Sequence, residues 1–213
     1  MINTSEPKDR IMDRTLLRSK FIKRFSSDPA TIRDIRDIEK IEQIDADERF
    51  PCQSPNEALM LASQAFPKAT AISFLPNGSV SDVPIIWTYK EYQEEVYRAA
   101  NMFHSLGLRP DQSVIFLLPN VPQFLFGLWG AQLAGIAAPI NPYLEVEHIA
   151  SIAKSANAKI LVTLAPSQPG GEDLWNKAMK AKSIASDIQQ IIVIGDSQDD
   201  YSSSWDQATR AQP

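Results

Sequence analysis

The sequence contains a single cysteine, Cys52, among its 213 residues, so an internal disulfide cannot form. An apolar segment of the kind found in secretory signals is also missing near the N-terminus. Together these absences predict a reducing, cytoplasmic setting. Cys52 has no histidine nearby in the sequence, so we favour a packing role for its thiol over a catalytic one.

Excess positive charge is absent as well. The chain has 21 lysines and arginines against 26 aspartates and glutamates, a formal net charge of -5 and an isoelectric point near 5.1. Binding to nucleic-acid backbones depends on clustered lysine and arginine. We therefore expect no nucleic-acid partner.

No uninterrupted apolar run is long enough to cross a bilayer, which takes about 20 residues in a helix. The most apolar region, residues 114–140, is divided by Pro119 and Pro122 into a strand-like piece, 114–118, and a helix-like piece, 124–133. This division predicts buried α/β core in place of a membrane span.

Common motifs for phosphate and metal binding are missing too. No G-x-G-x-x-G follows a predicted strand and no G-x-x-x-x-G-K-[ST] occurs, so a dinucleotide-binding fold and a P-loop NTPase are disfavoured. The two histidines, His104 and His148, have no H-E-x-x-H or C-x-x-C partner, which leaves zinc without a ligand set. The residues alone therefore indicate no catalytic, cofactor-binding or metal site.

Charge is concentrated in residues 1–50, which hold eleven lysines and arginines and eleven aspartates and glutamates. We expect a charged helical extension here. Residues 8–24 carry seven basic and two acidic residues, with apolar residues that could form one helical face. A docked surface helix is favoured over weak contact with an anionic membrane surface. A second helix over 28–45, with isoleucines every third residue from Ile32 to Ile41, predicts a packing face.

Helix and strand patterns alternate from residue 51 to 195, the predicted body. Strands are expected at 69–75, 84–87, 113–118, 136–140, 159–164 and 190–194, with helices at 57–66, 88–106, 121–133, 146–156 and 175–186. A turn at 76–78 would join the first two strands as a hairpin, and Thr88 with Glu91 forms a capping-box pattern. This order predicts an α/β fold with a mainly parallel sheet flanked by helices. Residues 196–213 are acidic, rich in serine and aperiodic, which predicts a polar linker or tail with Trp205 exposed.

Ligands of an open parallel sheet bind beyond the carboxyl ends of its strands. The loops after Leu118, Leu164 and Ile194 are therefore the first places to search for a site. The second of these loops opens a helix near Glu172 and Asp173. Those carboxylates complement the helix dipole themselves and would repel phosphate, so capping is favoured over phosphate binding.

Seven short segments between residues 87 and 163 occur in an order that resembles a known family. They are W-T-Y-K-E-Y at 87–92, R-A-A-N at 98–101, L-G-L at 106–108, V-I-F-L-L-P-N at 114–120, A-G-I at 134–136, P-I-N-P at 139–142 and A-K-I-L-V-T at 158–163. The set resembles the N-terminal region of the adenylate-forming, AMP-binding superfamily, and the Asn141-Pro142 pair and the W-G-A stretch at 129–131 resemble its acyl-CoA synthetase branch most. Asp111-Gln112 departs from the family's usual Gly-Asp and changes a turn.

The resemblance implies a parent enzyme that joins a carboxylic acid, fatty or aryl, to ATP with release of pyrophosphate and then passes the acyl group from AMP to CoA. It implies ATP, Mg2+ and CoA as cofactors of that parent, which acts in fatty acid metabolism. The family's phosphate loop, ribose-binding aspartate and catalytic lysine lie downstream of the matching region. The resemblance therefore assigns no catalytic, cofactor or metal residue to 1–213 and implies a truncated fragment that is inactive alone.

Two other hypotheses stay open from sequence. One is a stand-alone α/β binding or interaction module without catalysis, and the other is an unrelated α/β enzyme. If the fragment hypothesis holds, the remainder of the same polypeptide is the natural partner. The truncated sheet should then expose an apolar patch and tend to self-associate.

Overall fold

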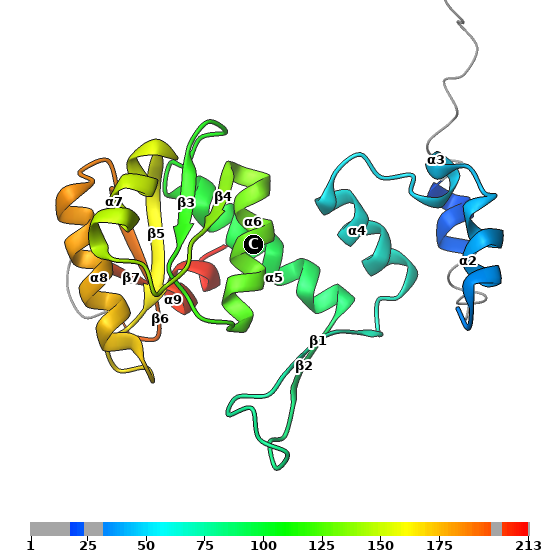
Figure 1. Cartoon of the computed structure of the whole chain (residues 1–213), viewed down its shortest axis with the longest axis horizontal. Helices are drawn as coiled ribbons and strands as arrows, with labels where there is room; N and C mark the ends of the chain where they lie inside the picture. Colours follow the sequence, from blue (N-terminus) through cyan, green and yellow to red (C-terminus); the bar gives the residue numbers. More distant parts are fainter. Residues whose placement is uncertain (1–17, 24–31, 197–201, 213) are drawn as a thin grey trace, which may run out of the picture. The chain divides into compact units, whose positions relative to one another are not determined.

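The computed structural model describes residues 18–23, 32–196 and 202–212 of the chain (Figure 1). Two compact units divide the chain, Met1–Ala69 and Thr70–Pro213. The first contains a helical segment at 18–23 followed by α2 (Ile35–Glu42), α3 (Ala46–Arg49) and α4 (Pro55–Ala65). Most of the predicted basic segment 8–24 lies outside the described residues, so its contact with a membrane surface stays a prediction.

Side-chain caps begin the two longer helices of the first unit. The carboxylate of Asp34 accepts a hydrogen bond from the backbone N–H of Arg36 at 2.9 Å at the start of α2. The hydroxyl of Ser54 accepts one from the backbone N–H of Glu57 at 3.2 Å at the start of α4. Such caps satisfy N–H groups that have no partner within the helix. The side chain of Glu57 also pairs with the Arg18 guanidinium.

The predicted isoleucine packing face in the first unit is wrong. Ile32 and Ile35 are 59% and 63% exposed, and α2 has no buried residue. The repeat was sufficient to form an amphipathic helix, but its isoleucines are at most partly buried. The helix is also shorter than the predicted 28–45, and residues 28–31 lie outside the described residues.

The second unit begins with a hairpin and continues as an α/β sheet. Strands β1 (Thr70–Phe74) and β2 (Ile85–Thr88) pair antiparallel, as the turn signal predicted, and lead into α5 (Tyr89–Ser105). The elements that follow are β3 (Ser113–Phe116), α6 (Pro122–Ala134), β4 (Ile136–Pro139), α7 (Val146–Ser155), β5 (Ala158–Leu164), α8 (Gly171–Ile184), β6 (Gln190–Ile194), β7 (Ser202–Ser204) and α9 (Trp205–Arg210).

Five parallel strands in the order β4-β3-β5-β6-β7 form the sheet, which confirms the predicted fold class. Helices α5, α6 and α9 pack together on one face, and α7 and α8 cover the other (Figure 1). Strands β3, β5 and β6 are buried along nearly their whole length. Burial on both faces explains why these segments read as continuous apolar runs.

The predicted capping box of α5 is confirmed. Thr88 Oγ1 accepts a hydrogen bond from the Glu91 backbone N–H at 3.3 Å, and the Glu91 carboxylate accepts one from the Thr88 backbone N–H at 2.8 Å. Gly107, with φ of 80°, follows the end of the helix. Few residues other than glycine adopt this left-handed conformation, so the sequence marks both ends of α5.

The predicted tail is wrong for residues 202–212. Strand β7 pairs with β6 through Ile191 and Ser202, and the next residue after the strand, Trp205, is only 2% exposed. The Trp205 and Phe103 rings meet edge to face, with centroids 6.0 Å apart. Because β7 consists of three serines, its composition did not predict a strand. The buried tryptophan directly after it holds the segment against the sheet. Within the described part of the chain, no helix is both long and apolar enough to span a membrane.

Candidate functional site

The strand order places a topological switch between β3 and β5. From β3 the chain passes through α6 to β4 on one side, and from β5 it passes through α8 to β6 on the other side. Divergence of the two connections opens a crevice at the carboxyl ends of the flanking strands, where ligands of such sheets bind. Here the flanking loops are 117–121 and 165–170, two of the loops that the sequence indicated.

A tight turn fixes the loop after β5. The Ala165 N–H donates to the Ile194 carbonyl at 3.0 Å, and the Gly171 N–H donates to the Gln168 carbonyl at 2.8 Å. A Cβ at position 171 would lie 1.9 Å from the Ala165 carbonyl oxygen. Only glycine fits at that distance, so the start of α8 can lie directly against the end of β5.

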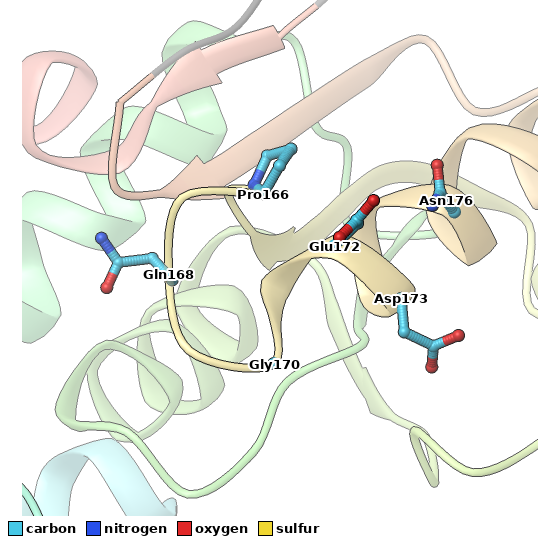
Figure 2. A pocket seen from close by; sticks show the side chains of 6 residues that line it. All are labelled: Pro166, Gln168, Gly170, Glu172, Asp173 and Asn176. Atoms are coloured by element: carbon cyan, nitrogen blue, oxygen red, sulfur yellow. The ribbon is translucent and has the colours of Figure 1, made fainter.

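An open pocket of about 510 Å³ lies against this loop, lined by Pro166, Gln168, Gly170, Glu172, Asp173 and Asn176. Figure 2 shows Glu172, Asp173 and Asn176 on the first turns of α8 and Gln168 on the loop, with Gln168 and Asp173 directed away from each other. None of the six lining side chains is basic. The pocket is therefore polar and acidic, and it presents no charge that would attract a phosphate.

Lys177 is the nearest cation in sequence to the pocket, and it already has partners. Its Nζ atom lies 3.1 Å from Asp173 Oδ2 and donates to the Pro142 carbonyl oxygen at 3.1 Å. These contacts tie the loop after β4 to α8. In that loop Asn141 Oδ1 accepts a hydrogen bond from the Tyr143 N–H at 2.9 Å. The Asn141-Pro142 pair thus has a structural function: it shapes a turn held by Lys177.

A second cavity of about 180 Å³ lies beside the loop after β3 and is mainly apolar. It is lined by Ile72, Ser73, Phe74, Asn120, Val121, Pro122, Phe124 and Leu125. The Phe124 ring meets the ring of Phe116, the last residue of β3, with centroids 5.9 Å apart. This cavity therefore adjoins the switch point on the side of the hairpin.

The sequence analysis disfavoured Cys52, His104 and His148 as catalytic or metal-binding residues, and the three lie on different parts of the chain. Cys52 lies in the first unit, where burial raises the pKa of its thiol, and a thiol kept protonated is a weak nucleophile. His104 on α5 and His148 on α7 are exposed. No three histidine, cysteine, aspartate or glutamate side chains gather to hold a metal ion within residues 18–23, 32–196 and 202–212. The pocket residues Gln168 and Asn176 carried no motif in the sequence, whereas the Asp173–Lys177 pair was visible as an i,i+4 spacing.

Residues 61–213 match the family model described as "AMP-binding enzyme". The chain belongs to this family. The chain is 43% identical over 193 residues to Marinolic acid--CoA ligase of Pseudoalteromonas sp. The match covers 91% of the chain and 29% of that ligase. It is 33% identical over 138 residues to Crotonobetaine/carnitine--CoA ligase of Escherichia coli, covering 63% of the chain and 26% of that protein.

The fold of the chain is similar to that of the solved Acetoacetyl-CoA Synthetase from Streptomyces lividans. The TM-score is 0.64 at 21% identity, over 74% of the chain and 25% of that synthetase. The family resemblance noted in the sequence is confirmed. The chain spans less than a third of the length of the ligases that it matches.

Proposed function

We propose that the chain is the N-terminal part of an ATP-dependent acid–CoA ligase. Such a parent joins a carboxylic acid to ATP, giving acyl-AMP and pyrophosphate, and then transfers the acyl group to the CoA thiol with release of AMP. Identity of 43% with a CoA ligase over 91% of the chain carries this proposal. We further propose an acid of the fatty or aryl class and a cytoplasmic location for the parent.

The described residues of this chain do not fit ATP and Mg2+ as a binding site. The pocket at the switch point carries the Glu172 and Asp173 carboxylates, and Lys177 beside it is already paired with Asp173. Charge developing on phosphate needs cationic groups held in place before the reaction. We therefore derive no step through ATP, Mg2+ or CoA here. The chain's proposed contribution is the scaffold at the switch point.

Acid-dependent exchange of pyrophosphate into ATP tests this function. The complete gene product, supplied with a panel of fatty and aryl acids, should catalyse the exchange, and residues 1–213 alone should not. Exchange by residues 1–213 would contradict the inactive-fragment proposal. No exchange by the complete protein with any acid would contradict the ligase proposal.

The size of the native protein decides between a ligase fragment and a stand-alone module. An antibody raised against residues 1–213 should detect a protein far heavier than 23.7 kDa in the source cells. A native protein of that lower mass would favour the binding or interaction module instead.

A further inference from the structure

The turn between β1 and β2 contains the only asparagine of the sequence that is followed by glycine, Asn77-Gly78 (Figure 1). Both residues are exposed. An Asn-Gly pair is chemically labile, because glycine has no side chain to hinder attack of its backbone nitrogen on the asparagine amide. A Cβ at position 78 would meet no atom within 4 Å, so neighbouring groups do not crowd the pair either. The sequence of the turn therefore favours spontaneous deamidation.

Deamidation of this pair needs only water as a co-reactant. The Gly78 backbone nitrogen loses its proton and bonds to Asn77 Cγ, the bond from Cγ to Nδ2 breaks, and Nδ2 takes up a proton and leaves as ammonia. Water then opens the cyclic succinimide at either carbonyl, which yields aspartate or isoaspartate at position 77. The net change replaces NH2 with OH. A neutral hydrogen-bond donor thus becomes an ionised acceptor.

Hydrogen bonds of the folded turn engage both groups that must react. The Gly78 N–H donates to the Leu75 carbonyl oxygen at 3.2 Å, so loss of its proton would break this bond. The Asn77 side-chain amide donates to Asp82 Oδ1 at 3.0 Å, so departure of Nδ2 as ammonia would break a second bond. Hydrogen bonds to a carboxylate are stronger than those between neutral groups. The folded turn therefore opposes the reaction that its sequence favours.

Asp82 also fixes the backbone on both sides of Gly78. Its Oδ2 atom accepts hydrogen bonds from the backbone N–H of Asn77 at 2.7 Å and from that of Ser79 at 3.3 Å. The Asn77 side-chain amide lowers the pKa of Asp82 most, and nearby backbone N–H groups, including that of Gly78, lower it further. The carboxylate is thus ionised at neutral pH, and its negative charge opposes removal of the Gly78 proton.

We propose that Asn77 is a deamidation site and that the Asp82 carboxylate suppresses the reaction while the hairpin turn is closed. Local opening of the turn, or loss of the carboxylate, allows the reaction. The product removes the amide donor and places a second carboxylate beside Asp82, and isoaspartate also inserts a methylene group into the backbone. Because the two carboxylates repel each other, the modified turn cannot close in its original form. Deamidation is thus an irreversible opening of the turn.

Mass spectrometry of the peptide that contains residue 77 measures the reaction. The complete gene product is incubated at mildly alkaline pH, and a synthetic peptide of residues 71–88 gives the rate without the fold. Asn77 should deamidate at least about tenfold more slowly in the folded protein than in the peptide, because the reaction requires the turn to open. Equal rates in the two samples would overturn the proposal.

Asp82→Ala tests the carboxylate itself. In the folded protein this variant should deamidate at position 77 at least about tenfold faster than the unchanged protein, because hydrogen bonds to a charged group are lost. Asp187→Ala is the matched control, since it removes an exposed carboxylate whose described partner is Lys159. That control should leave the rate unchanged. An unchanged rate in Asp82→Ala, with the circular dichroism spectrum of the unchanged protein, would refute suppression by Asp82.

The same measurement in urea separates the fold from the local sequence. In the unfolded state the unchanged protein and Asp82→Ala should deamidate at equal rates, because the hydrogen bonds of the turn are absent from both. If Asp82→Ala is faster by the same factor in urea and in buffer, the effect belongs to the sequence and the proposed role of the folded turn is wrong.

Asn77→Asp imitates one product and tests its structural consequence. The Ser79 backbone amide should exchange at least about tenfold faster in this variant, because the turn that holds it is open more often. Amides of α8 serve as the internal reference and should exchange as before. Unchanged exchange at Ser79 would contradict the opening of the turn by deamidation.

Discussion

Replacement of Trp205 by alanine should destabilise the second unit strongly. The indole is 2% exposed, meets the Phe103 ring edge to face, and lies so near Gly127 that a Cβ there would be 3.1 Å from Trp205 Cη2. Truncation therefore leaves a cavity between α5, α6 and the sheet. Loss of a buried tryptophan side chain costs about 3–5 kcal/mol in the free energy of unfolding.

Urea unfolding followed by far-ultraviolet circular dichroism measures this loss. With a slope of about 2 kcal/mol per molar urea, the midpoint should fall by roughly 1.5–2.5 M. Tyr143→Ala is the control, because it removes an aromatic ring that is 88% exposed. That variant should change the free energy of unfolding by less than about 0.5 kcal/mol.

A small effect of Trp205→Ala would refute the reasoning. If the free energy of unfolding falls by less than about 1 kcal/mol, the ring is not buried in solution as described. Residues 202–212 would then be the polar tail that their composition suggests. Equal losses in Trp205→Ala and Tyr143→Ala would point the same way.

Two further predictions concern close packing and pH. Gly130→Val should cost about 1–3 kcal/mol by urea unfolding, because a Cβ at this position would lie 2.8 Å from Ala99 Cβ and 2.9 Å from the Ala100 nitrogen. The same residue introduced at exposed Gln132 should be nearly neutral, and equal costs would contradict the close contact of α5 with α6. The Asn77 side-chain amide, with the backbone N–H groups of Asn77 and Ser79, lowers the pKa of Asp82 below its ordinary value of 3.8. The hydrogen bonds of the turn should therefore be fully formed above pH 3.8 and weaken as the pH falls through the lower pKa of Asp82 in the folded state. The NMR shift of the Ser79 amide would follow this change. Titration of Asp82 at or above 3.8 would contradict the network.

The sheet was predictable because its strands are buried on both faces. Runs such as the one at 190–194 can be satisfied only in the middle of a sheet, and the helices between them impose parallel pairing. The ends of α5 could be predicted because Thr88, Glu91 and Gly107 each cap the helix through contacts within a few residues. The inner face of α6 could not be predicted, because apolar residues occur on all its sides and the pattern favours no direction. Only Gly127 and Gly130, where α6 approaches its neighbours, distinguish that face.

The location of the candidate site could be predicted from the sequence, but most of its lining residues could not. Parallel strands put their carboxyl ends at one edge, so the loops after Leu118 and Leu164 were identified before any residue in them had a role. The lining residues Gln168 and Asn176 belong to no motif, and their meeting depends on the turn at Gly170 and Gly171. Contacts of Lys177 with the Pro142 carbonyl span 35 positions in sequence, a separation that local patterns do not report.

The exposed isoleucines of α2 and the buried serines of β7 show opposite failures of the same inference. Periodic apolar residues predict a helix face that favours burial, but burial needs a partner, and no residue of α2 is fully buried. Strand β7 has no apolar residue, yet Ser202 and Ser204 are buried because β6 pairs with the backbone and Trp205 holds the segment in place. Composition predicts which environment a segment favours, whereas the elements packed against it determine whether it is buried. The exposed valines and isoleucines of the hairpin follow the same rule, because an apolar side chain is buried only where another element covers it.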